Sequence, residues 1–146
     1  MNTRLTLIPA VYIFLEKEGQ FLLIRRANTG YQDGNYQTPA GHVEEQETPR
    51  EAAVREAKEE IGIDINPEDL EFMHAAYRMH PDKTGYRIDI FFRTSKWQGE
   101  VANMEPEKCD DLLWATQDEL PENTVELIRT ALEHIKKGSY LSEFIY

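Results

Sequence analysis

The chain has 146 residues, a length that suits one domain with an ordinary hydrophobic core, and we expect a single domain over residues 1–146. Forty per cent of the residues are apolar and 29% are charged, which indicates a globular protein rather than a disordered one. The formal net charge of −11 argues against a general binder of nucleic acid or of anionic membranes, because such partners require a basic surface. A small phosphorylated ligand is compatible with this charge if a divalent cation lies between ligand and protein.

The only cysteine, Cys109, excludes an internal disulfide framework and is typical of a reducing compartment. One apolar run, at residues 5–15, is too short to span a bilayer and contains Pro9. We interpret this run as a buried strand, and we expect the protein to lie in the cytoplasm.

The first half of the chain has the pattern of a hairpin, a loop and one helix. Residues 5–15 and 21–27 are predicted strands joined by a turn at Gly19, residues 28–36 a loop, and residues 37–43 a short extended segment. Residues 48–51, Thr-Pro-Arg-Glu, form a capping box with proline at the first helical position. Gly62 can end the helix in the left-handed conformation, so the helix is predicted to span residues 49–61.

The second half continues with strands and then a helix. Strands are predicted at 70–77, 86–95 and 112–115, the first two joined by a polar loop at 80–83. A second helix is predicted from about 124 to 137, with Asn123 and Glu126 as a capping pair and Gly138 as its stop. This order of strands and helices predicts an α/β fold in which helices cover a mixed sheet.

The first predicted helix carries an unusual group of glutamates. At about 3.6 residues per turn, Val54, Ala57 and Ile61 lie on one side, and Glu56, Glu59 and Glu60 project from a neighbouring face. Like charges at this spacing cost roughly 0.2–0.5 kcal/mol per pair. A solvated acidic face is the ordinary explanation for a charged run, but it does not account for such crowding. Hard oxygen ligands on one helix face suit Mg²⁺.

Residues 41–63 as a whole resemble the Nudix box, the sequence motif of the Nudix hydrolases. The places of that motif are occupied here by Gly41, Glu47, Arg55, Glu56, Ala57, Glu59, Glu60, Gly62 and Ile63. The motif is long and its spacing fixed, so the match is specific, and the predicted loop and helix supply its structural context. The resemblance implies an α/β/α sandwich around a mixed β-sheet. It also implies hydrolysis of a diphosphate linkage in a nucleoside diphosphate derivative, with Mg²⁺ or Mn²⁺ as cofactor.

The resemblance also assigns roles to residues of the motif. It implies that Glu56, Glu59 and Glu60 bind the metal ion, with the carbonyl group of Gly41 as a possible further ligand. Arg55 would orient the carboxylates, and Glu47 and Gly62 would hold the loop and helix together. The general base differs among Nudix enzymes: Glu56 and Glu59 are candidates within the motif, and Glu105 and Glu107 are candidates beyond it.

Residues outside the motif give weaker indications of the substrate. Arg25 and Arg26 resemble residues that contact substrate phosphates, although they can equally be an ordinary cationic strand end. Trp114 resembles a tryptophan of MutT-like nucleoside triphosphate hydrolases and could stack on a base, although most aromatic side chains belong to the core. A purine edge could bind Asp118, or the pair formed by the aspartates at 110 and 111. Ala40 replaces a glycine of the usual family sequence before Gly41.

Three functions remain compatible with the sequence. The preferred one is hydrolysis of a (deoxy)nucleoside triphosphate, possibly oxidised, to monophosphate and pyrophosphate. The second is hydrolysis of a nucleotide sugar, ADP-ribose or a dinucleoside polyphosphate; Pro81 and Tyr77 do not match the spacing of the residues that accompany such activities. The third is a non-catalytic Nudix module that binds a nucleotide. We expect a small nucleotide as substrate, and either a monomer or a homodimer.

Overall fold

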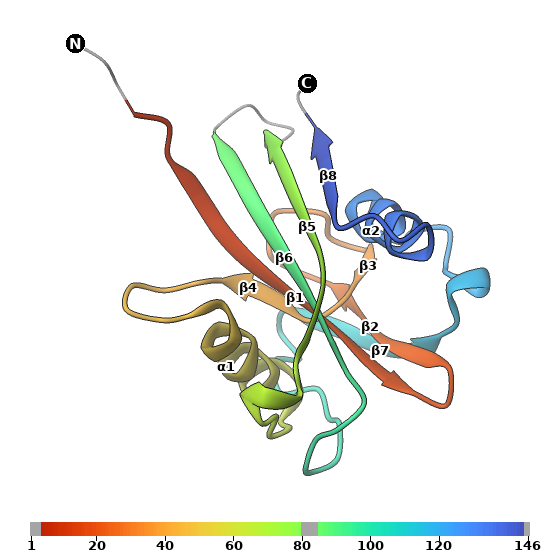
Figure 1. Ribbon diagram of the computed structural model, residues 1–146. Helices are drawn as coiled ribbons and strands as arrows, with labels where there is room; N and C mark the ends of the chain where they lie inside the picture. The colour runs from red at the N-terminus through yellow and green to blue at the C-terminus, as the bar shows by residue number, and fades with distance from the viewer. Residues whose placement is uncertain (1–3, 80–84, 145–146) are drawn as a thin grey trace.

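The computed structural model describes residues 4–79 and 85–144 (Figure 1). The described strands are β1 (Leu7–Lys17), β2 (Gln20–Arg26), β3 (Tyr36–Gln37), β4 (Ala40–His42), β5 (Glu71–Met79), β6 (Tyr86–Thr94), β7 (Cys109–Ala115) and β8 (Leu141–Phe144). The helices are α1 (Pro49–Ile61) and α2 (Glu126–Lys136), with short 3₁₀ turns at Pro67–Asp69 and Gln117–Glu119.

The strands form a mixed sheet in the order β3-β2-β1-β6-β5-β8, with β4 paired to β1 and β7 paired to β2. β1 runs parallel to β6 and β5 runs parallel to β8, whereas the pairs β1–β4, β2–β7 and β5–β6 are antiparallel. α1 and α2 lie on opposite sides of the sheet (Figure 1). This arrangement confirms the predicted α/β/α sandwich.

β1 is buried on both faces and supplies side chains to two separate cores. Val11, Ile13 and Leu15 pack with the buried face of α1. Alternate residues point to opposite faces of a strand, so the even-numbered neighbours, such as Tyr12 and Phe14, pack in the core beside α2. The apolar run at residues 5–15 is therefore a buried strand, as predicted.

α1 has the predicted bounds and the predicted caps. The hydroxyl of Thr48 accepts a hydrogen bond from the Glu51 amide, and the Glu51 carboxylate accepts one from the Thr48 amide. Gly62 ends the helix with φ of 73°, in the left-handed region that a side chain disfavours. A helix fixed at both ends holds the glutamates of its exposed face in a defined relation to the sheet.

The prediction for the N-terminus of α2 was wrong. The helix begins at Glu126, after Val125, and no side chain caps it. The Asn123 side chain instead donates a hydrogen bond to the Gly34 carbonyl, 2.7 Å away, because a loop carbonyl competes successfully for this amide. Gly138, with φ of 77°, follows the helix as predicted.

Several strands also differ from the predictions, most of them by one or two residues at their ends. β7 begins three residues before the predicted residue 112, the extended segment at 37–43 is divided into β3 and β4, and β8 was not predicted at all. β8 contains only four residues and depends on pairing with β5, so it carries little local signal. The polar loop predicted at 80–83 lies outside the described residues.

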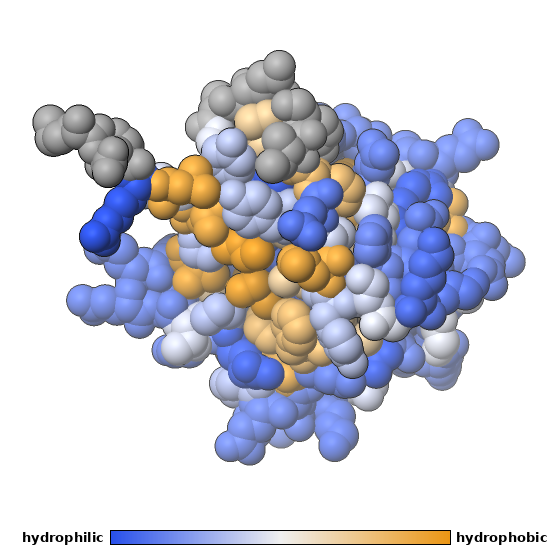
Figure 2. Space-filling model, turned by 45° about the horizontal axis from the view of Figure 1, so that its top comes forward, coloured by the Kyte–Doolittle hydropathy of each residue, from blue (hydrophilic) through white to orange (hydrophobic). Residues whose placement is uncertain are grey.

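The surface includes several exposed hydrophobic side chains. Leu5, Leu7 and Ile8 are exposed at the beginning of β1, and hydrophobic side chains gather among polar ones on the face drawn in Figure 2. In the described part of the chain, no helix is both long enough and apolar enough to cross a membrane.

Candidate functional site

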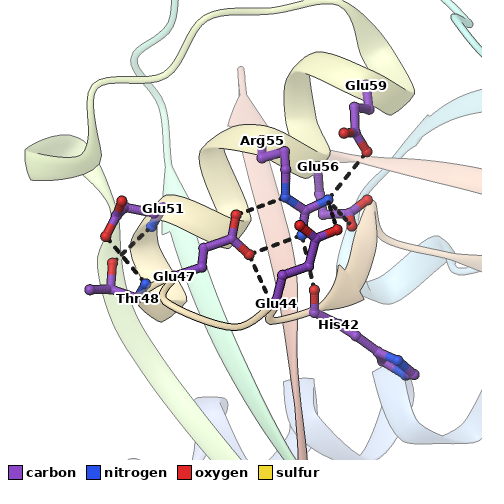
Figure 3. Close-up of polar contacts among 8 residues, drawn as sticks. All are labelled: His42, Glu44, Glu47, Thr48, Glu51, Arg55, Glu56 and Glu59. Atoms are coloured by element: carbon purple, nitrogen blue, oxygen red, sulfur yellow. Dashed lines mark hydrogen bonds and ion pairs between the residues drawn. The ribbon is translucent and has the colours of Figure 1, made fainter.

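Arg55 organises the polar end of α1. Its Nε and one terminal nitrogen donate to the two carboxylate oxygens of Glu47, at 2.7 and 3.0 Å, in the two-pronged geometry that arginine makes with a carboxylate. The other terminal nitrogen donates to Glu56 at 2.8 Å and to Glu59 at 3.3 Å, and the His42 carbonyl accepts a further bond at 3.0 Å (Figure 3). One guanidinium therefore joins the helix to the loop that precedes it and to β4.

Glu47 completes this connection from the loop side. Its carboxylate also accepts a hydrogen bond from the Glu44 amide at 3.0 Å. The hydrogen bonds from Arg55, with that of the Glu44 amide, hold the pKa of the Glu47 carboxyl below its usual value. Glu47 and Arg55 thus connect the loop to the helix, and their role as positioning residues stays a prediction.

The carboxylates of Glu56 and Glu60 both lie next to the backbone of β4. Burial raises the pKa of both carboxyls, and the charge of Glu56 raises that of Glu60 further. The Ala40 amide donates a hydrogen bond to Glu60 at 3.3 Å. Two partly buried carboxylates that face each other are stabilised when a cation lies between them.

Gly41 allows the Glu56 carboxylate to lie against the backbone of β4. A Cβ atom built at Gly41 would be 2.1 Å from the Glu56 carboxyl carbon, far inside the van der Waals distance. Only glycine leaves this space, which is a physical reason for the glycine that opens the motif. Ala40 is the departure from the family sequence. Its φ angle is not positive, and it pairs with Tyr12 in the β-ladder, so this position accepts a side chain.

A cavity of about 530 Å³ opens in front of these carboxylates. Its lining comes from α1, the end of β2 and the loops at residues 28–29 and 105–109. Glu56, Glu59 and Glu60 line it together with Arg55 and with two further cations, Arg26 and Lys108. The cavity thus places acidic groups, able to hold a cation, beside basic groups, able to hold an anion.

The donor set fits a hard divalent cation such as Mg²⁺ or Mn²⁺, since carboxylate oxygens are the ligands these ions prefer. Glu56 and Glu60 already meet, but the Glu59 carboxylate is paired with Arg55 and its side chain is 52% exposed. In the described ranges no three acidic, histidine or cysteine side chains stand in a ready-made metal-ion geometry. To bind the metal ion, the Glu59 carboxylate would therefore have to leave its ion pair with Arg55.

The two general-base candidates beyond the motif are placed differently. Glu105 lines the cavity and contributes to the raised pKa of Glu60, after burial and Glu56. Glu107 is exposed and lies outside the cavity lining; its backbone carbonyl accepts a hydrogen bond from Asn28. The structure therefore favours Glu105 over Glu107.

Arg25 and Arg26, at the end of β2 where the pairing with β7 shifts register, have different surroundings. Arg26 lines the cavity and donates to Thr29 and to the Tyr31 carbonyl, which holds the loop against the strand. Arg25 pairs with Asp110 at 2.6 Å and does not line the cavity. Only Arg26 is placed to contact a substrate held there.

The side chains expected to bind a base do not gather at this cavity. Trp114 stacks on Trp97, with ring centres 6.3 Å apart, and packs against the core beside α1. Asp118 is exposed in a 3₁₀ turn, and neither residue lines the cavity. Asp111 accepts a hydrogen bond from the Tyr36 hydroxyl. The structure gives Trp114 the core role that was the alternative to base stacking.

Sequence reasoning missed one polar group, on the other side of β4. Arg78 and Asp89 form a buried ion pair, with 2.5 Å between Nε and Oδ2, and the Tyr12 hydroxyl lies against both. The signal was present in the pattern. In the strand sequence YRIDIFF, Asp89 lies on the face opposite Ile88 and Ile90 and shares its face with Phe91, and a carboxylate buried beside a core aromatic requires a partner.

Comparison with known proteins then decides the family, since the NUDIX domain model matches residues 6–135. The chain belongs to the Nudix family. An ADP-ribose pyrophosphatase of Methanocaldococcus jannaschii is 37% identical over 102 residues, 67% of this chain but only 57% of that protein. The 8-oxo-dGTP diphosphatase of Escherichia coli K12 is 29% identical over 115 residues, 77% of this chain and 85% of that protein.

Solved structures show the same Nudix fold. A MutT NUDIX hydrolase from Burkholderia pseudomallei superimposes with a TM-score of 0.80 at 23% identity, covering 88% of this chain and 97% of the other. This likeness supports the α/β/α architecture. The named relatives act on different compounds, so membership of the Nudix family leaves the substrate of this chain open.

Proposed function

We propose that this Nudix chain hydrolyses a phosphoanhydride bond in a nucleoside diphosphate derivative, with Mg²⁺ or Mn²⁺ as cofactor. The observation that carries the proposal is the cluster at the end of α1. Glu56 lies against Gly41, Glu60 accepts from the neighbouring Ala40 amide, and Arg55 binds the Glu56 carboxylate. Such crowding is unfavourable in a protein of net charge −11 unless it serves a cation.

A metal ion bound by Glu56, Glu59 and Glu60 would neutralise charge on the diphosphate and would lower the pKa of a coordinated water. Arg55 keeps the Glu56 carboxylate oriented through the 2.8 Å bond. Arg26 and Lys108, on the wall of the same cavity, are placed to bind the phosphate that leaves. Glu105, at the cavity wall, is placed to accept a proton from the attacking water, with Glu56 and Glu59 as the alternatives within the motif.

The preferred substrate is a (deoxy)nucleoside triphosphate, possibly oxidised, cleaved to monophosphate and pyrophosphate. The resemblance to MutT-like enzymes and the 8-oxo-dGTP diphosphatase among the relatives support this preference. The second candidate is a nucleotide sugar, ADP-ribose or dinucleoside polyphosphate, which the archaeal ADP-ribose pyrophosphatase favours. We infer that the protein acts in the cytoplasm on small nucleotides, as a monomer or a homodimer.

Product analysis with Mg²⁺ tests this proposal. The panel contains canonical and oxidised (deoxy)nucleoside triphosphates, ADP-ribose, nucleotide sugars and dinucleoside polyphosphates, with the Glu59→Gln variant assayed in parallel. Monophosphate plus pyrophosphate from a triphosphate, lost in Glu59→Gln, is the expected result. Two phosphorylated products from a sugar or dinucleotide substrate would instead support the second candidate.

The same panel would argue against catalysis if the protein binds nucleotides but hydrolyses none of the compounds with Mg²⁺ or Mn²⁺. That outcome would assign the chain to the third candidate class, a non-catalytic Nudix module. Rates in Glu59→Gln equal to those of the unmodified protein would remove Glu59 from the metal site.

A further inference from the structure

A second cavity lies next to the carboxylate cavity and has the opposite charge. It measures about 270 Å³, and three arginines, Arg26, Arg78 and Arg87, are among its lining residues. Tyr12 and Tyr31 supply aromatic walls. We call it the basic cavity.

The basic cavity adjoins the proposed reaction site through β4 and the end of β2. Arg26 and Gln37 line both cavities. Gly41 lines the basic cavity, and the Glu56 carboxylate lies against this same residue. A substrate whose diphosphate lies at Glu56 therefore has the basic cavity within reach of its next chemical group.

The charges of the basic cavity are not balanced by its own lining. None of the described residues that line it is acidic. Asp89, buried behind the wall, pairs with Arg78 and also feels the charge of Arg87, so one carboxylate faces two of the three arginines.

Arg78 is held rigidly by its partner. Asp89 is fully buried and accepts from Nε at 2.5 Å and from a terminal nitrogen at 3.4 Å. A guanidinium fixed by a buried carboxylate presents its remaining edge without losing rotamer freedom when a ligand binds. Preorganised cations of this kind are characteristic of phosphate recognition.

The size of the cavity limits what it can bind. Ligand sites commonly measure about 300–1,000 Å³, so a cavity of 270 Å³ accommodates part of a substrate rather than a whole nucleotide. Its polar lining is dominated by arginines, which bind anions, and the aspartates expected to bind a base lie elsewhere. A single phosphate group matches both the size and the charge.

We propose that the basic cavity binds a second phosphate of the substrate, one that is not cleaved, carried on the ribose 2′ or 3′ hydroxyl. The substrate class is then a ribose-phosphorylated nucleoside diphosphate derivative. This inference rests on the proposed function for the position of the cleaved diphosphate. Arg87 is the residue that distinguishes the two classes of substrate, because it lines the basic cavity but not the carboxylate cavity.

Calorimetric binding of AMP, adenosine 3′,5′-bisphosphate and adenosine 2′,5′-bisphosphate tests the proposal. None of these probes contains a diphosphate linkage, so binding is measured without turnover, both with Mg²⁺ and with EDTA. We expect at least one bisphosphate to bind about tenfold or more tightly than AMP, since a bidentate arginine–phosphate contact contributes well over 1 kcal/mol. Arg87→Gln should remove this preference.

Arg93→Gln is the matched control. Arg93 belongs to the same strand as Arg87 but lies near its other end, where it pairs with Glu71 and Glu16. This variant should retain the full preference for the bisphosphate. Equal binding of AMP and both bisphosphates by the unmodified protein would overturn the proposal, whether or not the Arg87 variant folds. A preference that survives in Arg87→Gln would overturn it as well.

The binding ratio separates this inference from the proposed function. Failure of hydrolysis across all triphosphates, with the bisphosphate preference intact, would count against the proposed function alone. Hydrolysis of nucleoside triphosphates without any bisphosphate preference would count against the basic cavity alone.

Discussion

Two arginine–carboxylate clusters lie on either side of β4, and their charge balance differs. Around Arg55, four carboxylates lie between 2.7 and 3.7 Å from the guanidinium, those of Glu44, Glu47, Glu56 and Glu59. Around Arg78, the described residues provide one carboxylate, that of the buried Asp89. The first cluster has an excess of negative charge beside an open cavity, and the second is a balanced pair inside the sheet.

This difference separates a cluster that requires a cation from an ion pair whose two charges already balance. A balanced pair can be buried, provided that its geometry satisfies both partners. An excess of one sign at the wall of a cavity is unfavourable until a ligand of the opposite sign binds. The carboxylate cavity therefore indicates a cation, and the two additional arginines next to Arg78 indicate an anion.

Removing a carboxylate from the crowded cluster should abolish turnover without harming the fold. Glu60→Gln eliminates a like charge facing Glu56, so the melting temperature should stay constant or rise. Loss of a metal-ion ligand should reduce kcat/KM by on the order of 10³-fold, since metal ions supply several kcal/mol in such reactions. Kinetics and thermal melting of the variant check both parts. The exposed Glu133→Gln is the control and should change neither quantity.

Removing the carboxylate of the balanced pair should have the opposite effect on stability. Asp89→Asn leaves the charge of Arg78 buried and unpaired, which should reduce the free energy of unfolding by roughly 3 kcal/mol. Denaturant titration measures this loss. A stability equal to that of the unmodified protein would mean that Arg78 reaches solvent or another anion. The comparison between the two clusters would then fail.

A smaller change tests the contact between β4 and the cluster. Gly41→Ala places a methyl group where the Glu56 carboxylate now lies, so the carboxylate must move. We expect activity to fall by roughly 10–100-fold, the usual effect of displacing the surroundings of a metal ligand, with little loss of stability. Ala40→Gly, one residue earlier, is the matched control and should retain activity. Full activity in Gly41→Ala would show that the position of Glu56 is not critical.

The smallest expected effect concerns a neutral polar cluster that has no part in either cavity. His74 Nδ1 faces the Ser139 carbonyl at 2.9 Å, which makes Nδ1 the protonated nitrogen, and Nε2 then accepts from the Ser142 hydroxyl at 2.8 Å. Burial lowers the pKa of His74, and the nearby His134 acts in the same direction.

Because the folded pKa lies below that of the unfolded chain, His74 contributes its full stabilisation above about pH 6.5 and loses it as the pH falls. The raised pKa values of Glu60 and Asp89 make the fold more stable as the pH falls, which is the opposite effect. This effect is the same in the unmodified protein and in a His74→Gln variant, so it cancels in the comparison. The loss of melting temperature from pH 7.5 to 5.5 should therefore be larger in the unmodified protein than in His74→Gln. An identical loss would show that His74 does not titrate in this range.

The parts of the fold that the sequence predicted are those with local signals. The limits of α1 follow from Thr48 and Gly62, and the burial of β1 follows from its continuous apolar run. The cap of α2 was wrong because Asn123 had a long-range partner, the Gly34 carbonyl. β8 was missed because four residues are too few to show a period.

The same distinction applies to the site. The fixed spacing within one helix brought Glu56, Glu59 and Glu60 to one face, and the family motif added Gly41 and Arg55. Residues from distant segments were less predictable, because their positions depend on the sheet register. Asp118 and Glu107 lie outside the cavity, whereas the arginine at 87 enters the basic cavity only through the pairing of β6 with β1.

The most direct test of the central claim is binding of Mn²⁺, measured by electron paramagnetic resonance without any nucleotide. The carboxylate cluster predicts one Mn²⁺ site in the unmodified protein, weakened about tenfold or more in Glu56→Gln and in Glu60→Gln. It predicts no change in Asp89→Asn, where the carboxylate belongs to a balanced pair. Equal Mn²⁺ affinity in the unmodified protein and both glutamate variants would contradict the assignment of the α1 carboxylates as a metal site.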